Sequence, residues 1–497
     1  MISPHLLPRL PGFLESLVRD QNPWWRNERQ ANLAQGKRWL FATVKRSLVE
    51  GLSPITVLRG PRQVGKSTLQ NQVIDELIAD GISPKRILRV QFDDLRDIRD
   101  LHEPILEIAH WYAQTVLGQT LNVALLEDSP IYFFFDEVQN LRDWAVQSKH
   151  LVDIHKGLRV LLTGSSALRI EAGRDSLAGR ITMLEMGPLL LREIMQWRLK
   201  EDVTPLLTNG PTPLKQIAFW QALRQQGIDE VEKRQRAFQM FSERGSYPLA
   251  QSNPSATWEE IADQLNETVV RRAIQHDLRV GERGMRRDEG LLESVFRMAC
   301  RYSGQAPNLK LFVEELNETM QAGIGAQRVR KYIEFLDATM LIRTIEPLEL
   351  RLKKRKGAAK FCLCDHALRA AWMQEVVPLT PDALAQQPAL SDLAGRIAES
   401  VAGYFFRSII NLNVAHFPAR PGEPEVDFVL TLGDQRIPVE IKYRRRIDSS
   451  DQNGLLSFLD KIHYNAPFGV LITLLDEAPT TDPRIVSIPL STLLMAR

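Results

Sequence analysis

Residues 55–69 constrain the fold more than any other stretch of the chain. A short, largely β-branched run at residues 55–58 leads into the pattern G-x-x-x-x-G-K-[ST], matched at every fixed position by Gly60-Pro61-Arg62-Gln63-Val64-Gly65-Lys66-Ser67. In such a loop the glycines let backbone N–H groups close around phosphate oxygens, and the following helix N-terminus adds a positive dipole. A chance match is the alternative, but the strand-like run before the loop and the helical pattern after it favour a phosphate-binding turn.

The positions of this loop have distinct expected roles toward a nucleotide. Lys66 would neutralise the β and γ phosphates of ATP, and Ser67 would hold the accompanying Mg²⁺. The sequence therefore predicts an ATP site that is formed by Gly60, Pro61, Arg62, Gln63, Val64, Gly65, Lys66, Ser67 and Thr68.

Four further strand-like runs follow the loop, at residues 87–92, 131–135, 159–163 and 181–186. Strands that alternate with helical or loop-rich crossovers predict an α/β fold with a parallel sheet covered by helices on both faces. One of these runs lies between the loop strand and the strand that ends in acidic residues. That order is typical of the P-loop NTPases that carry their own catalytic glutamate.

The run Ile131-Tyr132-Phe133-Phe134-Phe135 reads as a buried strand, and two carboxylates, Asp136 and Glu137, follow it directly. Asp136 would complete the Mg²⁺ shell, and Glu137 would polarise the attacking water. Capping of a following helix is the alternative for acidic residues at this place. The phosphate-binding loop upstream favours the catalytic interpretation.

Two later positions are candidates for completing the nucleotide site. In Thr163-Gly164-Ser165-Ser166 a small hydroxyl, Ser165, would sense the γ phosphate, with helix capping as the competing explanation. Arg180, or else Arg174, would reach the nucleotide of a neighbouring subunit, because arginine is a planar and permanently charged donor to phosphoryl oxygens. This arginine in trans predicts a homo-oligomer, and an ordinary surface arginine is the alternative.

The middle of the chain divides at turn-rich segments. Residues 1–36 form a proline-containing lead segment, residues 37–203 the nucleotide-binding core, and residues 204–285 a helical lid or linker. Residues 286–365 show three amphipathic helical patterns and two strand-like runs, which is the pattern of a winged helix. Five cations in the joining segment, residues 351–357, fit phosphate contacts of DNA, and an exposed loop is the alternative.

A second group of chemically active residues lies in the last part of the chain. Residues 425–430 and 437–442 read as a hairpin around a turn at Gly433-Asp434. Glu440 and Lys442 are two residues apart and project from one face of their strand, and Asp427 lies on the adjacent strand. Asp427 and Glu440 can therefore converge on one metal ion. The alternative is a surface pattern in which the charges pair across strands.

This hairpin resembles the PD-(D/E)xK nuclease fold. The resemblance implies that Asp427 and Glu440 ligate Mg²⁺, that Lys442 positions or activates the attacking water, and that Glu399 is the acidic residue of the first helix. Val426 stands where that family commonly has proline, a tolerated variation. The resemblance to this fold implies a restriction-endonuclease-like α/β domain over residues 366–497.

The motifs in their order resemble the bacterial and archaeal AAA-type ATPases with a C-terminal nuclease-like domain of unknown function. They are the phosphate loop, FFFDE, TGSSAL, SLAGR, GSYP, KYIEFLDATMLIR and EVDF…VEIK. The resemblance implies an AAA-type core with a helical lid, a winged helix and the nuclease-like domain.

Composition limits the partners. The net charge of +2 is too small for a global field, so nucleic-acid affinity would come from local patches. No apolar run approaches the roughly 18 residues needed to cross a bilayer, and the N-terminal residues lack the charged, apolar and small-residue order of a signal peptide, which predicts a cytoplasmic protein without a membrane partner. Three cysteines argue against a disulfide framework, and Cys362 and Cys364 are expected to be buried thiols rather than a metal-binding pair.

These observations predict an ATP-dependent nucleic-acid-processing enzyme, an ATPase that gates a Mg²⁺-dependent DNA endonuclease. DNA is favoured over RNA as the partner. The alternative is a non-catalytic regulatory ATPase switch that binds DNA or a protein through its winged-helix and nuclease-like domains. A motor that translocates on nucleic acid is a third interpretation.

Overall fold

The structure is a computed structural model that describes residues 10–30, 33–34, 36–93, 98, 101–127, 129–164, 177–208, 210–277, 288–349, 357–480 and 482–497. The chain divides into two compact units. The first comprises Met1–Met186 with Asp277–Met285, and the second comprises Gly187–His276 with Arg286–Arg497.

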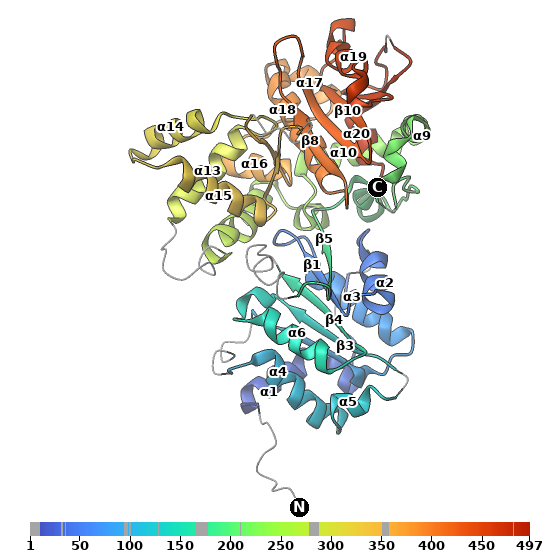
Figure 1. Ribbon diagram of the computed structural model, residues 1–497, viewed down its shortest axis with the longest axis vertical. Coiled ribbons are helices and arrows are strands. Elements are labelled where there is room, and N and C mark those ends of the chain that lie inside the picture. Colours follow the sequence, from blue (N-terminus) through green and yellow to red (C-terminus); the bar gives the residue numbers. More distant parts are fainter. Residues whose placement is uncertain are drawn as a thin grey trace, which may run out of the picture. The chain divides into compact units, whose positions relative to one another are not determined.

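The first unit is built on a five-stranded sheet in the order β2-β3-β4-β1-β5 (Figure 1). Its strands are β1 (Ile55–Arg59), β2 (Ile87–Gln91), β3 (Ile131–Asp136), β4 (Leu158–Gly164) and β5 (Ile181–Glu185), and every pair is parallel. Strand β4 lies between β1 and β3. The predicted α/β core of the P-loop NTPase type is confirmed, with each strand within two residues of its predicted bounds.

Helices cover both faces of this sheet. Helices α2 (Phe41–Glu50) and α3 (Lys66–Ala79) pack together on one face, and α4 (Pro104–Tyr112) and α6 (Trp144–Ile154) pack together on the other (Figure 1). A short helix, α5 (Leu121–Ala124), precedes β3. The aromatic run of β3 is fully buried, as its apolar sequence predicts. This packing fixes the strand ends that carry the candidate nucleotide site.

The lead segment covers the exposed edge of β2. Helix α1 (Gly12–Asp20) is followed by Asn22, whose side-chain amide donates to the carbonyl of Arg89 and accepts from its N–H, both at 2.7 Å. The indole N–H groups of Trp24 and Trp25 both donate to the carbonyl of Ile87. An edge strand presents unpaired backbone groups that invite pairing with another chain, and these side chains satisfy them.

The second unit contains a mixed sheet in the order β12-β11-β10-β9-β8. Strands β8 (Asn413–Phe417), β9 (Val426–Leu432) and β10 (Gln435–Lys442) are antiparallel neighbours, whereas β11 (Gly469–Thr473) and β12 (Ile485–Pro489) run parallel to β10. Helix α18 (Ser391–Arg407) packs on one face and α19 (Asn453–Leu459) on the other. The chain order is therefore α18-β8-β9-β10-α19-β11-β12, closed by α20 (Leu490–Leu494).

The helices of the predicted lid pack within the second unit. Helices α9 (Ile217–Asp229) and α10 (Val231–Arg244) contact α20, and α9 also contacts β12. Buried Arg234 binds the carboxylate of Asp476 with two hydrogen bonds of 2.7 Å. Helices α8 (Leu191–Ile194), α11 (Pro248–Ser252) and α12 (Trp258–Leu265) belong to the same unit. The boundary between the units therefore follows Met186 rather than residue 203, and a lid function for residues 204–285 stays a prediction.

The helices and strands of residues 286–365 occur in the predicted order. Helices α13 (Glu289–Arg301), α14 (Leu309–Met320) and α15 (Ala326–Ala338) precede an antiparallel hairpin of β6 (Ile342–Ile345) and β7 (Lys360–Leu363). Helices α16 (His366–Met373) and α17 (Pro381–Gln386) then lead to α18. The cations of residues 351–356 lie outside the described residues, so their DNA contact stays a prediction.

Backbone hydrogen bonds join this hairpin to the mixed sheet. The N–H of Leu348 donates to the carbonyl of His416 in β8 at 2.7 Å, and the N–H of His416 donates to Glu346 at 3.1 Å. Cys362 in β7 and Cys364 directly after it are buried free thiols, as predicted, and burial raises the pKa of both. None of the helices in the described part of the chain combines the length and the apolar character that a membrane crossing requires.

Candidate functional site

The phosphate-binding loop connects β1 to α3 in the first unit. Gly65 caps α3 with a φ of 93°, a backbone conformation that glycine adopts without strain. The ammonium of buried Lys66 donates to the carbonyls of Gly60 at 3.0 Å and Pro61 at 2.8 Å. The loop thus curls around its own lysine, as the motif predicts. Residues 60–68 all lie in this loop and the first turn of the helix.

The acidic end of β3 contains the two carboxylates predicted for hydrolysis. Asp136 is fully buried, and its Oδ1 accepts a hydrogen bond from Thr163 at the end of β4. Glu137 has a φ of 54° and a ψ of 43°, and its carboxylate accepts from the amide of Gln139. A glutamate in the left-handed region is strained, and such strain concentrates at functional sites. Ser165 and Arg174, the other predicted members, lie outside the described residues.

The polar residue that contacts Asp136 from β4 is therefore Thr163, which the sequence analysis placed in the same motif without assigning it a role. A second unassigned residue is Arg89 in the middle of β2. Its guanidinium lies 3.2 Å from Gln70 Oε1, 3.0 Å from Gln91 Oε1 and 3.4 Å from Asp136 Oδ2. The sequence did contain a signal for Arg89, because it is a charged residue inside the apolar run ILRVQ. A charge that is buried with such a strand needs a partner.

Arg180 lies at the start of β5, and its Nε donates to Asp153 Oδ1 at 2.7 Å. Both side chains are about one-third exposed. The guanidinium thus has a partner within its own unit, and a role at a neighbouring subunit's nucleotide requires that this ion pair open. The arginine in trans stays a prediction.

In the second unit, the hairpin of β9 and β10 brings the predicted acidic residues together. The backbone N–H of Ile441 donates to Asp427 Oδ2 at 2.9 Å, so Asp427 faces the strand segment that contains Glu440 and Lys442. Lys442 Nζ lies 2.6 Å from Glu440 Oε1. Glu399 of α18 reaches the same place through a shared partner. The four predicted residues form one largely buried cluster, named here the acidic cluster.

That shared partner is Lys360, the first residue of β7. Its side chain is only 2% exposed, and its ammonium binds Glu399 Oε1, lies 3.2 Å from Asp427 Oδ1 and lies 3.9 Å from Glu425 Oε1. Lys360 is 39 residues from Glu399 and 67 from Asp427 in the chain. No local pattern could have linked it to the site, and the sequence analysis missed it.

Burial and mutual repulsion set the protonation of the acidic cluster. Burial and the neighbouring Asp427 raise the pKa of Glu399 well above its usual range. Burial alone would raise the pKa of Asp427, but the charge of Lys360, together with hydrogen bonds from Glu399 and the Ile441 N–H and the charge of Lys442, holds that pKa below the usual range. Burial, with the charge of Asp427, raises the pKa of Glu440 to about 8. At neutral pH the cluster therefore combines an ionised Asp427 with a charged Lys360, and the other acids hold protons more tightly than usual.

One feature of the acidic cluster favours binding of a divalent cation, and two features oppose it. Glu440 Oε2 is buried and has no hydrogen-bond partner, an orphaned oxygen of the kind that a cation would satisfy. Yet among the described residues no group of three or more His, Cys, Asp or Glu side chains is arranged to hold a metal ion. Lys360 binds the oxygens that a cation would use. The cluster in this conformation does not fit a metal.

His416 of β8 lies near the cluster, and its pKa depends on the charge of Lys360. Burial, with the positive charge of Lys360, lowers its pKa to about 4, and its Nε2–H donates to the carbonyl of Ala358 at 2.9 Å. Between pH 6.5 and 4 the unfolded chain binds a proton here that the folded protein does not bind. We therefore expect this residue to lower the free energy of unfolding by up to about 3 kcal/mol as the pH falls through that window.

This expectation is checked by urea unfolding of wild type and His416→Gln at pH 7 and pH 4.5, because glutamine keeps an N–H donor without a titrating ring. The variant should show a shallower loss of stability toward acid pH. Equal losses in the two proteins would show that His416 is not buried in its neutral form.

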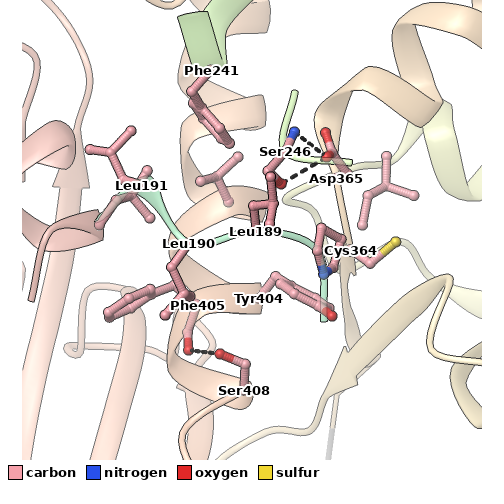
Figure 2. A pocket seen from close by; sticks show the side chains of 14 residues that line it. Leu189, Leu190, Leu191, Phe241, Ser246, Cys364, Asp365, Tyr404, Phe405 and Ser408 are labelled. Atoms are coloured by element: carbon pink, nitrogen blue, oxygen red, sulfur yellow. Dashed lines mark hydrogen bonds between the residues drawn. The ribbon is translucent and has the colours of Figure 1, made fainter. Parts of the chain in front are cut away.

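A small pocket in the second unit lies apart from these residues. It has a volume of about 60 Å³ and is lined mostly by apolar side chains, among them Leu189, Phe241 and Phe405. Figure 2 shows that its carboxylate, Asp365, receives hydrogen bonds from the N–H and the hydroxyl of Ser246, at 2.5 and 2.8 Å. Asp365 also accepts from the N–H of Ala367, so this carboxylate has a structural role.

Three segments of the chain match models of known protein families. Residues 52–195 match a family model described as "AAA domain". Residues 235–377 and 395–493 match two models described as domains of unknown function, DUF8612 and DUF4143. An uncharacterized protein of Haemophilus influenzae is 20% identical over 413 residues, which are 82% of this chain and 86% of that protein.

Two solved structures are similar over most of the chain. The Walker-type ATPase PABY2304 of Pyrococcus abyssi is 16% identical with a TM-score of 0.41, and the match covers 70% of this chain and 99% of that one. Cdc6p of Pyrobaculum aerophilum is 13% identical with a TM-score of 0.24, covering 75% and 96%. The family match and the strand order identify residues 52–195 as an AAA-type P-loop ATPase domain.

Proposed function

We propose that this protein hydrolyses MgATP in its first unit and uses the nucleotide cycle to control a metal-dependent DNA endonuclease site in its second unit. The observation that carries the ATPase part is the position of buried Asp136 and strained Glu137 at the end of β3, in a sheet where β4 separates that strand from the loop strand β1.

The residues of the first unit divide the chemistry among them. Lys66 would leave the loop carbonyls of Gly60 and Pro61 and donate to phosphate oxygens, and Ser67 and Asp136 would hold Mg²⁺, which offsets phosphate charge when it is bound. Glu137 would accept the proton of the attacking water. Arg89 and Thr163 would keep the Asp136 carboxylate oriented, since each contacts one of its oxygens.

The endonuclease part rests on the acidic cluster. The order of helix and strands around it, α18-β8-β9-β10-α19-β11, puts two acids and a lysine on adjacent strands and a third acid on the preceding helix. The pKa of Glu440, raised to about 8, is typical of the perturbed acids that gather at active sites. These features support a hydrolytic site for phosphodiesters.

Three arginines shortly after β10 would contact nucleic acid. Arg444, Arg445 and Arg446 are all exposed and follow Lys442 of the acidic cluster within four residues. Arginine clusters of this kind bind phosphates, with an affinity that falls as salt rises. DNA is the proposed partner.

We expect Arg445→Glu/Arg446→Glu to weaken binding of a labelled DNA duplex by about ten-fold or more and to flatten the salt dependence of that binding. Fluorescence anisotropy across a salt series measures both effects. The matched control is Arg224→Glu/Arg236→Glu, which reverses two exposed arginines of α9 and α10. Equal losses in both double variants would contradict a phosphate contact beside the acidic cluster.

The nuclease assignment is tested by incubating labelled single- and double-stranded DNA with the full chain, Mg²⁺ and ATP. Glu440→Gln and Lys442→Met are each expected to reduce cleavage by about 10²-fold or more, since these groups would act on the reacting atoms. The control Lys461→Met removes a lysine that is ion-paired with Glu423 in the same unit. Cleavage that persists in Glu440→Gln would exclude the acidic cluster as its source.

A second candidate function is a non-catalytic ATPase switch that binds DNA or a protein partner through the second unit. The observation that favours it is Lys360, whose ammonium fills the acidic cluster. This candidate predicts ATP hydrolysis and DNA retention without strand cleavage under any nucleotide condition.

A further inference from the structure

The acidic cluster is closed by a residue from outside the sheet and helix that build it. Lys360 belongs to the β6–β7 hairpin, and its ammonium contacts Glu399 and Asp427 while its side chain remains 2% exposed. These two acids come from α18 and β9, the elements on which the cluster is assembled. A lysine therefore supplies the positive charge at a place where an endonuclease of this type would need a divalent cation.

An ammonium and a divalent cation cannot share these oxygens. Lys360 Nζ binds Glu399 Oε1 and lies 3.2 Å from Asp427 Oδ1, so the coordinating oxygens already face a positive charge. A second cation placed there would be repelled at short range in a buried, weakly screening environment. Lys360 thus competes directly with a metal for Glu399 and Asp427.

The cluster also contains an oxygen that Lys360 does not satisfy. Glu440 is 6% exposed, its Oε1 is bound by Lys442, and its Oε2 is buried without a hydrogen-bond partner. Buried carboxylate oxygens are normally paired, so an orphaned one beside Asp427 indicates a missing donor or cation. This oxygen would complete a cation site once the ammonium withdraws.

The position of Lys360 is set by how the hairpin docks. Strand β7 packs on α18 at Gly403, where any side chain would collide, because a Cβ atom would lie 2.4 Å from Cys362 Sγ. The segment that follows β6 is also held, because the N–H of Leu348 donates to the carbonyl of His416 in β8. A shift of the hairpin relative to α18 and β8 would carry Lys360 away from the two acids.

We propose that Lys360 is an internal latch that takes the place of the divalent cation, so that the acidic cluster binds metal only when the β6–β7 hairpin moves away. This inference rests on the proposed nuclease-like site and adds its regulation. The docked hairpin, connected to the three helices α13 to α15, closes the site, and the event that opens it must pull Lys360 out of its contacts with Glu399 and Asp427.

The test is a titration of the nucleotide-free full chain with Mn²⁺, followed by electron paramagnetic resonance of the free ion. Wild type should bind Mn²⁺ only weakly. Lys360→Met should gain a Mn²⁺ site in the second unit whose affinity exceeds that of wild type by about ten-fold or more. Lys360→Met/Asp427→Asn should lose the new site, which assigns it to the acidic cluster. The matched control Lys461→Met should behave as wild type.

Equal Mn²⁺ binding by wild type and Lys360→Met would overturn the latch, and so would a folded Lys360→Met that gains no site. If Lys360→Met does not fold, the double variant Lys360→Met/Glu399→Gln replaces it in the titration. It keeps Asp427 and Glu440 and removes the negative charge of Glu399, which would otherwise lose its partner. DNA cleavage is a separate readout. Metal binding without cleavage in Lys360→Met would reject the nuclease proposal and leave the latch in place.

Discussion

Lys66→Ala is expected to reduce ATP hydrolysis by about 10²-fold or more, because it removes the ammonium that would stabilise charge on the transferred phosphoryl group. Its buried amine donates to the loop carbonyls of Gly60 and Pro61, and we expect the first unit to keep its fold in this variant. Phosphate release at saturating MgATP, followed by a coupled assay, measures the effect.

Two further variants separate binding from hydrolysis. Glu137→Gln should lose hydrolysis to a similar degree while it still binds a fluorescent ATP analogue, because Glu137 would act on water rather than on the phosphates. Lys37→Ala removes an exposed lysine that is ion-paired with Glu76 in the same unit and should hydrolyse ATP at the wild-type rate. Retention of activity in Lys66→Ala would place the hydrolysis elsewhere.

Lys360→Ala should lower the free energy of unfolding of the second unit by about 3–5 kcal/mol, because it leaves the carboxylate of Asp427 buried without its cation. That loss is a large part of the stability of an ordinary domain. Urea unfolding, monitored by circular dichroism and by the fluorescence of the tryptophans, gives the value. Lys461→Ala, which breaks a partly exposed ion pair, should cost about 1 kcal/mol or less.

A double-mutant cycle tells whether the loss comes from this ion pair. Lys360→Ala/Asp427→Asn removes both charges, so it should be less destabilised than the sum of the two single variants by about 1 kcal/mol or more. Strict additivity would mean that Lys360 and Asp427 do not interact, in contradiction to their 3.2 Å separation.

The nucleotide site could be predicted almost completely because its determinants are local. The loop at residues 60–67 is continuous in the chain, and Asp136 and Glu137 follow directly on a strand that the apolar pattern identifies. Parallel strands then place their carboxyl ends together without further information. Arg89 escaped prediction because a single cation within a strand shows burial only when its partners, Gln70 and Asp136, are known.

The acidic cluster could be predicted only in part. Alternation along β10 put Glu440 and Lys442 on one face, and the hairpin turn put Asp427 beside them, as the structure has it. Lys360 comes from a strand that pairs with β6 and reaches the cluster through tertiary packing. The helices of residues 217–244 are a similar case: their apolar faces were readable, but the surface that they cover was not.

The two units suggest a division of labour in which nucleotide chemistry and the acidic cluster are linked by the state of the β6–β7 hairpin. In the proposed mechanism the AAA-type domain would supply energy, Lys360 would hold the cluster closed, and Asp427, Glu440 and Lys442 would act on DNA after it opens. The proposed latch would explain why the orphaned oxygen of Glu440 and the buried ammonium of Lys360 occur together.

The most direct test of this account is cleavage of end-labelled duplex DNA by wild type, Lys66→Ala, Lys360→Met and Glu440→Gln, each with Mg²⁺ in the presence and absence of ATP. Wild type should cut only with ATP, Lys66→Ala should not cut, and Lys360→Met should cut without ATP. Cleavage by wild type that is independent of ATP, or cleavage that survives Glu440→Gln, would contradict it.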